Sequence, residues 1–181
     1  MKPFFTFIAV AFLCMQSFSQ DHPSSKVEYV EAKDLIERVE EYISKTIETE
    51  GKIVHVCGVD KKKMKLFVEG IGAINIIPED ADTAFDYNFN QKEIKVVGVV
   101  KEIRILRKRI EEMEENLDIP CSIDKEPCID AAYKENKRNN GTLVESSNKG
   151  INRLKETMEE TQKNYISIVT IVAKTVELKE N

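Results

Sequence analysis

The stretch Ile94-Lys-Val-Val-Gly-Val-Val-Lys-Glu-Ile-Arg-Ile105 decides the fold. Its apolar side chains alternate between two faces, with Ile94, Val96 and Val100 on one of them, which predicts a β-strand. The run is also longer than an ordinary strand. Gly98 stands in its middle and has no side chain to pack, so we expect a bulge or a sharp bend there. A long, bent strand is typical of a sheet that curls on itself.

Four further strands are expected around this one. Their β-forming runs cover residues 46–57, 64–69, 73–77 and 165–178. Gly51 interrupts the first run, so two of the five strands contain a glycine that can make a bend. Five strands with two such bends fit a small closed or nearly closed barrel. Strands and helices do not alternate, which argues against a doubly wound parallel sheet.

Helical periodicity appears before the first strand and before the last one. Residues 30–44 have an apolar stripe of helical spacing, and we expect a helix of about four turns there. Two more stripes lie within residues 106–162: Leu106, Ile110, Met113 and Leu117, and then Ile151, Leu154 and Met158. We expect a helical insert at about residues 106–162, with the stripes facing each other or the barrel wall. The predicted fold class is α+β, mainly β.

The N-terminus has the pattern of an export signal. Lys2 precedes a short apolar run, and small residues follow at Ser17 and Ser19. We expect a signal peptide over residues 1–19, cleaved near Ser19, and a polar, disordered spacer over residues 20–29. One domain would then occupy residues 30–181. No second long apolar stretch follows, so we expect no transmembrane segment and a soluble protein in the periplasm or outside the cell.

Composition narrows the range of functions. The chain has 32 acidic and 27 basic residues, mixed along its length, and a net charge of −5. This balance argues against nucleic acid as a partner. Nucleotide-binding loops, serine-nucleophile elbows and His-Glu-x-x-His motifs are missing from the sequence. A non-enzymatic protein is therefore favoured over an enzyme.

A family resemblance adds to this picture. The stretch Glu48-Thr-Glu-Gly-Lys-Ile-Val-His-Val-Cys57 and the later Val96-Val-Gly-Val-Val100 resemble a group of uncharacterised exported OB-fold-like proteins from Bacteroidetes. The likeness covers about residues 45–105 and implies a five-stranded OB-like barrel, without supplying an activity. Many members have further His or Cys residues after the first Cys. A lysine-rich turn stands there in this chain, which weakens a metal-binding interpretation.

His55 and Cys57 are the first candidate site. They lie two residues apart on a predicted strand, so both point to the same side. Imidazole and thiolate are good ligands for zinc or copper, and a histidine can also activate a thiol. Two ligands do not complete a tetrahedral site, although Cys121 and Cys128 could add two more if the insert folds back. The alternative is a half-buried histidine beside a core cysteine.

Cys121 and Cys128 are the second candidate. Export would place them in an oxidising compartment, where the short loop between them is easily closed by a disulfide. We therefore expect a structural bridge, with Cys57 reduced and shielded. A redox couple is the alternative, although the spacing differs from the Cys-x-x-Cys of oxidoreductases.

The third candidate is an aromatic and acidic loop. Phe85, Tyr87 and Phe89 alternate with polar residues and could form a binding surface at the barrel mouth. The alternative is that these rings cap the open end of the core.

Two functions follow from these observations. The first is an exported OB-fold-like binding or interaction module for a small ligand or a periplasmic protein, without a cofactor. The second is a periplasmic metal-binding or thiol-redox protein that uses His55 and Cys57, with zinc or copper. The oligomeric state is not encoded in any pattern that we find.

Overall fold

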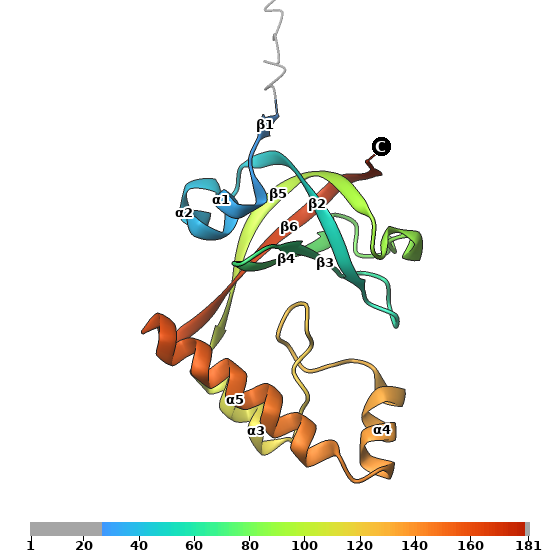
Figure 1. Cartoon of the computed structure of the whole chain (residues 1–181), viewed down its shortest axis with the longest axis vertical. Helices are drawn as coiled ribbons and strands as arrows, with labels where there is room; N and C mark the ends of the chain where they lie inside the picture. Colours follow the sequence, from blue (N-terminus) through green and yellow to red (C-terminus); the bar gives the residue numbers. More distant parts are fainter. Residues whose placement is uncertain (1–26, 180–181) are drawn as a thin grey trace, which may run out of the picture.

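Five strands close into a barrel in the computed structural model, which describes residues 27–179 (Figure 1). The predicted signal peptide, its cleavage site and most of the predicted spacer lie outside these residues. The barrel order is β2-β3-β4-β6-β5, and β5 returns to pair with β2. β4 and β6 run parallel and the other barrel pairs are antiparallel. This arrangement confirms the predicted α+β, mainly β fold with an OB-like barrel.

The elements agree closely with the periodicity of the sequence. The strands are β1 (Glu28–Tyr29), β2 (Thr46–Val56), β3 (Met64–Val68), β4 (Gly72–Pro78), β5 (Glu93–Leu106) and β6 (Tyr165–Leu178). The helices are α1 (Ala32–Glu37), α2 (Val39–Tyr42), the 3-10 turn η1 (Tyr87–Phe89), α3 (Arg107–Glu115), α4 (Ala131–Asn139) and α5 (Leu143–Thr161). Some details differ from expectation. The helix expected over residues 30–44 divides at Arg38, and β1 pairs with β2 within the stretch expected to be a spacer.

β2 continues through Gly51 instead of breaking there. Its first part, Thr46–Lys52, pairs with β5, and Ile53 begins the part that pairs with β3. A β-carbon on Gly51 would lie 2.9 Å from Cδ2 of Leu66. The glycine therefore lets Leu66 pack against the strand where β2 passes from one neighbour to the other.

Gly98 marks an irregularity in β5, as the sequence predicts. The register between β5 and β6 shifts between Val97 and Gly98. A β-carbon on Gly98 would collide with the carbonyl oxygen of Val172 and with a methyl group of Ile171. The missing side chain allows β6 to approach at the point where β5 bends.

The barrel interior is an apolar core. Leu35 of α1 joins it from outside the sheet and is fully buried. The strands contribute inward-facing aliphatic residues, among them Ile47, Ile53, Met64, Leu66, Ile74, Ile76, Ile94, Val96, Val100 and Ile171.

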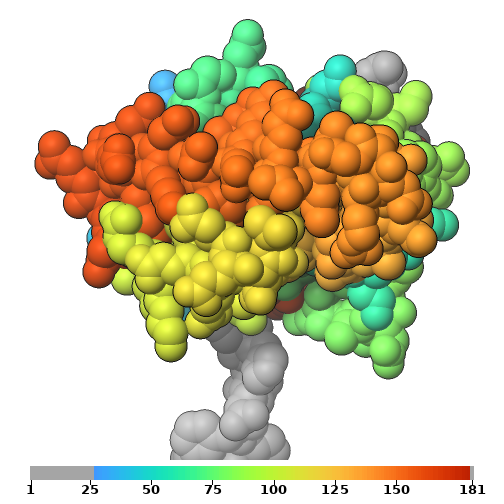
Figure 2. Space-filling view, turned by 90° about the horizontal axis from the view of Figure 1, so that it is seen from below, coloured from blue at the N-terminus to red at the C-terminus, as the bar shows by residue number. Residues whose placement is uncertain are grey.

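The helical insert has a core of its own. β5 and β6 remain paired up to Leu106 and Tyr165, and α3 and α5 pack against these strand ends (Figure 1). The residues of this second core are Ile105, Ile110, Met113, Ile151, Leu154, Met158, Ile166 and Ile168. Seen from below, α3, α4 and α5 cover this end of the molecule (Figure 2). The two predicted stripes therefore do face each other.

Leu106 and Leu117 are exceptions to that packing. Both are exposed, because α3 begins after Leu106 and ends at Glu115. A residue outside the helix does not follow the helical stripe. Among the helices of residues 27–179, none has the length and apolar character that a membrane span requires.

Candidate functional site

His55 and Cys57 lie at the end of β2, where the chain enters the turn to β3. His55 is exposed and Cys57 is buried. Two backbone hydrogen bonds close this turn. The N–H of Cys57 donates to the carbonyl oxygen of Lys63 at 2.8 Å, and the N–H of Lys61 donates to the carbonyl oxygen of Cys57 at 3.1 Å. His55 and Cys57 therefore lie at the end of the barrel that carries the β2–β3 turn.

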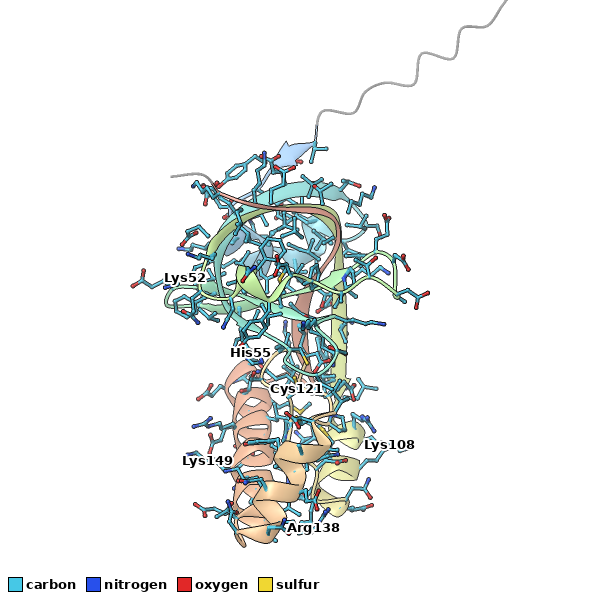
Figure 3. The ribbon with its side chains drawn as sticks, turned by 90° about the vertical axis from the view of Figure 1, so that its right-hand side faces the viewer. Lys52, His55, Lys108, Cys121, Arg138 and Lys149 are labelled. Carbon is cyan, nitrogen blue, oxygen red and sulfur yellow. The ribbon has the colours of Figure 1, made fainter. Side chains whose placement is uncertain are left out.

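The insert returns to this end of the barrel through a tight hairpin, residues 119–128. Pro120 pairs with Pro127, and the backbone N–H of Cys128 donates to the carbonyl oxygen of Ile119 at 2.8 Å. Ser147 fixes the base of the hairpin, since its hydroxyl donates to the carbonyl oxygen of Asp118 at 2.8 Å. Figure 3 shows Cys121 of this hairpin directly below His55, between the barrel and the helices.

A cavity of about 370 Å³ lies between the barrel and this hairpin, and we call it the insert cavity. Residues from three separate parts of the chain line it. The polar and titratable side chains of the lining are those of His55, Cys57, Lys63, Tyr87, Cys121, Ser122, Cys128, Asp130 and Tyr133. The structure therefore brings together His55, Cys57, Cys121 and Cys128, the four residues that the sequence placed in two separate candidates.

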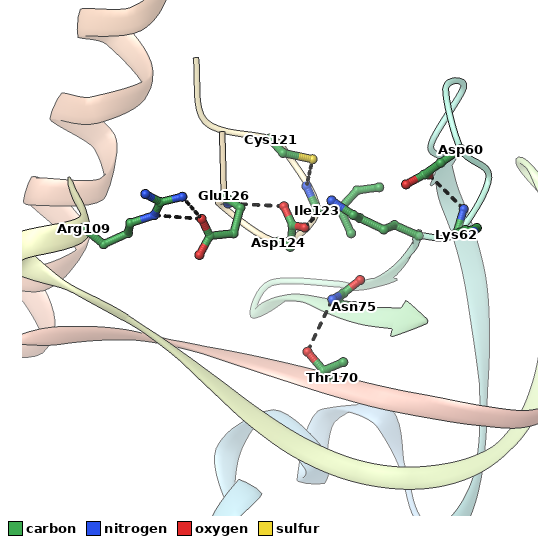
Figure 4. Close-up of polar contacts among 10 residues, drawn as sticks. Asp60, Lys62, Asn75, Arg109, Cys121, Ile123, Asp124, Glu126 and Thr170 are labelled. Carbon is green, nitrogen blue, oxygen red and sulfur yellow. Dashed lines mark hydrogen bonds and ion pairs between the residues drawn. The ribbon is translucent and has the colours of Figure 1, made fainter. Parts of the chain in front are cut away.

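Two ion pairs hold the insert hairpin in place. Lys63 Nζ lies 2.5 Å from a carboxylate oxygen of Asp124, with 19% and 12% of the two side chains exposed. Arg109 of α3 donates to one carboxylate oxygen of Glu126 at 2.7 and 2.9 Å (Figure 4). Burial by itself lowers the pKa of Lys63, but the hydrogen bond and the charge of Asp124 outweigh it, so the pKa is raised. Lys63 is a cation at neutral pH and ties the β2–β3 turn to the hairpin.

The three cysteines of residues 27–179 are free thiols in this structure. The bridge predicted between Cys121 and Cys128 is not formed. In the hairpin, Cys128 lies opposite Ile119. The backbone N–H of Cys121 donates to the backbone carbonyl oxygen of Glu126 at 2.7 Å. The two cysteines are therefore diagonal to each other across the hairpin and not directly opposite.

Cys121 is set up as a neutral thiol. Its burial raises the pKa of the thiol, and this effect outweighs the hydrogen bond that its Sγ accepts from the backbone N–H of Ile123 at 3.5 Å. A thiol that keeps its proton at neutral pH reacts slowly as a nucleophile.

A preformed metal centre is not found in the described residues. Nowhere in residues 27–179 do three His, Cys, Asp or Glu side chains come close enough together to hold a metal ion. The four His and Cys residues surround the insert cavity without converging on a single point. Of the residues that line the cavity, His55, Cys57, Cys121 and Cys128 are the ones whose side chains suit zinc or copper.

The aromatic loop is divided between two places. Phe85 is buried in the barrel core and Phe89 packs against that core, as in the capping alternative. Both also line a separate hollow of about 320 Å³ beside Asp80 and Lys174. Tyr87 is 51% exposed and lines the insert cavity. Of the three rings, Tyr87 is therefore the one that reaches the His55 and Cys57 site.

Several residues of the insert cavity were not singled out by sequence reasoning, among them the titratable residues Lys63, Asp130 and Tyr133. Lys63 belongs to a lysine-rich turn, and the other two lie at the start of α4. No spacing in the sequence relates a turn residue near position 60 to a helix near position 130. Lys63, Asp130 and Tyr133 line the same cavity because the insert returns to the barrel.

No protein-family model matches this chain, and no curated protein is significantly similar to it.

Proposed function

We propose that this protein is an exported binding module and that its ligand occupies the insert cavity. The observation that carries this proposal is the cavity itself, which at about 370 Å³ has the size of a small-molecule site. Apolar residues such as Val59, Ile119 and Ile129 line it together with a few polar groups. This mixture is typical of sites that orient a largely apolar ligand by a small number of hydrogen bonds.

The position of the cavity on the barrel supports the same proposal. One wall is the turn between β2 and β3, and the other comes from the insert between β5 and β6. Counted along the chain, β2 and β3 are the first and second strands of the barrel, and β5 and β6 are the fourth and fifth. OB folds bind their ligands with the loop between the first two strands and the loop between the last two. Tyr87 and Tyr133 are both exposed at the cavity, where rings can stack on a ligand.

Binding can be tested with a fragment library followed by NMR of the ¹⁵N-labelled protein. We expect hits to shift the amide signals of residues 57–63 and 119–133 together. Gly58→Leu should abolish these shifts, since Gly58 lines the cavity and has open space for a side chain. Lys149→Leu, on the exposed face of α5, is the matched control and should leave them unchanged. Hits that bind elsewhere, or that survive Gly58→Leu, would contradict the proposal.

Export is part of the proposal and has its own test. The basis is the leader-like pattern of residues 1–19 and the resemblance to exported OB-fold-like proteins of Bacteroidetes. Intact-mass measurement after expression in a Gram-negative host should give a product that begins near Gln20, recovered from the periplasm. A product that begins at Met1 would contradict export.

A thiol or metal function is the second candidate. It is favoured by one observation, namely that His55 and all three described cysteines line the same cavity. Thiolate and imidazole together suit zinc or copper. Elemental analysis of untagged protein decides between the candidates. Stoichiometric metal that is lost in both His55→Ala and Cys57→Ser would support this function over the first.

The disulfide between Cys121 and Cys128 belongs to the same question. Peptide mapping without reduction, on protein recovered from an oxidising compartment, should show a linked peptide if the hairpin shifts to bring the two cysteines together. A linked peptide that contains Cys57 would instead indicate thiol chemistry across the insert cavity.

A further inference from the structure

A second recess lies on the outer face of the barrel, next to the insert cavity. It has a volume of about 360 Å³ and is bounded by β3, β4, the first residues of β6 and the tip of the insert hairpin. We call it the lysine groove, and its main lining residues are Lys65, Phe67, Ile71, Ile123, Lys125 and Ile166. Ser122 is the one residue that it shares with the insert cavity.

The charges in the lysine groove are unbalanced. Both acids at the tip of the hairpin are already engaged, Asp124 with Lys63 and Glu126 with Arg109. Within residues 27–179, neither Lys65 nor Lys125 forms an ion pair. The groove therefore presents two cations without a carboxylate partner.

Lys125 is the less hydrated of the two. Its Nζ donates to the carbonyl oxygen of Ser122 at 3.1 Å. Burial lowers the pKa of Lys125 and the charge of Lys65 lowers it further, and together these outweigh the opposing effects of Cys121 and Asp124. An ammonium group in such a place is stabilised by an anion that replaces the lost water.

The rest of the groove is apolar. Phe67 follows Lys65 on the outward face of β3 and is 47% exposed. Ile71, in the turn to β4, is also exposed, and Ile166 and Ile168 of β6 continue the apolar lining. Outward positions of a solvated sheet are normally polar, so this patch suits the apolar part of a ligand.

We propose that the lysine groove binds a fatty acid, with the carboxylate between Lys65 and Lys125 and the single alkyl chain along Phe67 and Ile71. The carboxylate supplies the missing counter-charge, and the chain covers the exposed apolar surface. The volume suits one chain of moderate length.

Isothermal titration of the mature protein with decanoate below its micelle concentration tests this proposal. We expect one molecule to bind per chain, and acetate and decanol each to bind at least about tenfold more weakly, since each lacks one half of the recognition. The variant with Lys65→Ala and Lys125→Ala should lose about tenfold or more in affinity for decanoate. Lys52→Ala, an exposed lysine on β2, is the matched control and should bind as the wild type does.

Each contrary result has a clear meaning. If acetate bound as tightly as decanoate, the groove would be a site for small anions and the alkyl chain would play no part. If decanol bound as tightly as decanoate, the lysines would play no part. Either result would overturn the proposal. Unchanged decanoate binding in the double variant would place the ligand elsewhere. Decanoate should shift the amide signals of residues 65–73 rather than those of Gly58 and Val59, so the outcome is independent of ligand binding in the insert cavity.

Discussion

Single residues affect the stability of the barrel most strongly where the packed strands leave no space for a side chain. Gly98 is such a position, because β6 passes directly over its α-carbon. Gly58 is the opposite case, since nothing lies within 4 Å of a β-carbon placed there. The two glycines therefore form a matched pair for substitution.

Gly98→Ala should destabilise the protein by roughly 1–3 kcal/mol, the usual cost of forcing extra atoms into a packed site. The added methyl group would collide with backbone of β6 that cannot move without disturbing the β5–β6 ladder. Urea unfolding measures the change, and Gly58→Ala should unfold at nearly the wild-type concentration of urea. Equal midpoints for the two variants would show that β6 does not approach Gly98 closely.

Glu102 gives a residue-scale prediction about pH. Its side chain is 6% exposed and lies 2.6 Å from Arg104. Burial raises the pKa of Glu102, but the hydrogen bonds from Arg104 and Ser167 outweigh burial, so the pKa lies below its usual value of 4.5. A lowered folded-state pKa means that the carboxylate stabilises the protein above pH 4.5, and that this contribution is lost as the pH falls through the lower value.

Glu102→Gln should therefore cost on the order of 1 kcal/mol at pH 7, and the difference from the wild type should shrink at pH 3. Urea unfolding at both pH values provides the measurement. Glu135→Gln, on the exposed surface of α4, is the control and should have little effect at either pH. A difference that stays constant between pH 7 and pH 3 would contradict the ionised state of Glu102.

At the scale of the elements, α3 and α5 depend on the small core that they share. Met113 and Leu154 are buried in it, whereas Leu106 at the boundary of α3 is 54% exposed. An isolated helix as short as α3, which has 9 residues, is marginal in water, and packing of the apolar face supplies most of the stability of helices in proteins.

Met113→Lys and Leu154→Lys should each destabilise the insert by roughly 3 kcal/mol or more, since an unpaired charge would enter an apolar core. Leu106→Lys is the control and should change stability little. Thermal unfolding followed by circular dichroism at 222 nm reports the loss of helix. An unchanged melting temperature for the Met113 and Leu154 variants would mean that the stripes do not pack together.

At the scale of the whole molecule, the insert and the barrel are joined by the hairpin and its ion pairs. Lys63 and Asp124 come from the β2–β3 turn and the insert, and they meet at 2.5 Å. Loss of one partner leaves a poorly hydrated charge, which favours opening of the contact. The thiol of Cys121 beside this pair reports such opening.

Lys63→Met should speed the labelling of Cys121 by a thiol reagent by about tenfold, as expected if the pair stabilises the closed contact by roughly 1.4 kcal/mol. Lys62→Met is the control, because Lys62 lies in the same turn and does not contact the hairpin through an ion pair among the described residues. Mass spectrometry of labelled peptides follows the rate at Cys121. Equal rates in the two variants would show that the ion pair does not hold the hairpin.

The local pattern of the sequence determined the elements and the class of fold. The alternation in residues 94–105 predicted β5, and the nearly unbroken run of β-forming residues over 165–178 predicted β6. The helical spacing of Ile110, Met113, Leu154 and Met158 predicted the core of the insert. These features follow from which face of each element is apolar, and that information is present in neighbouring residues.

The tertiary structure alone decided where the candidate residues meet. His55 and Cys57 share a cavity with Cys121 and Cys128 because the insert returns to the barrel. Two ion pairs, Lys63 with Asp124 and Arg109 with Glu126, lie at this contact. The spacing of Cys121 and Cys128 predicted a disulfide, but the register of the hairpin sets them diagonally apart. Likewise, Phe85 and Tyr87 belong to the same predicted aromatic loop, but Phe85 is buried in the core and Tyr87 is exposed. Contacts between residues so far apart in the chain arise from the packing of whole elements, which short-range periodicity does not encode.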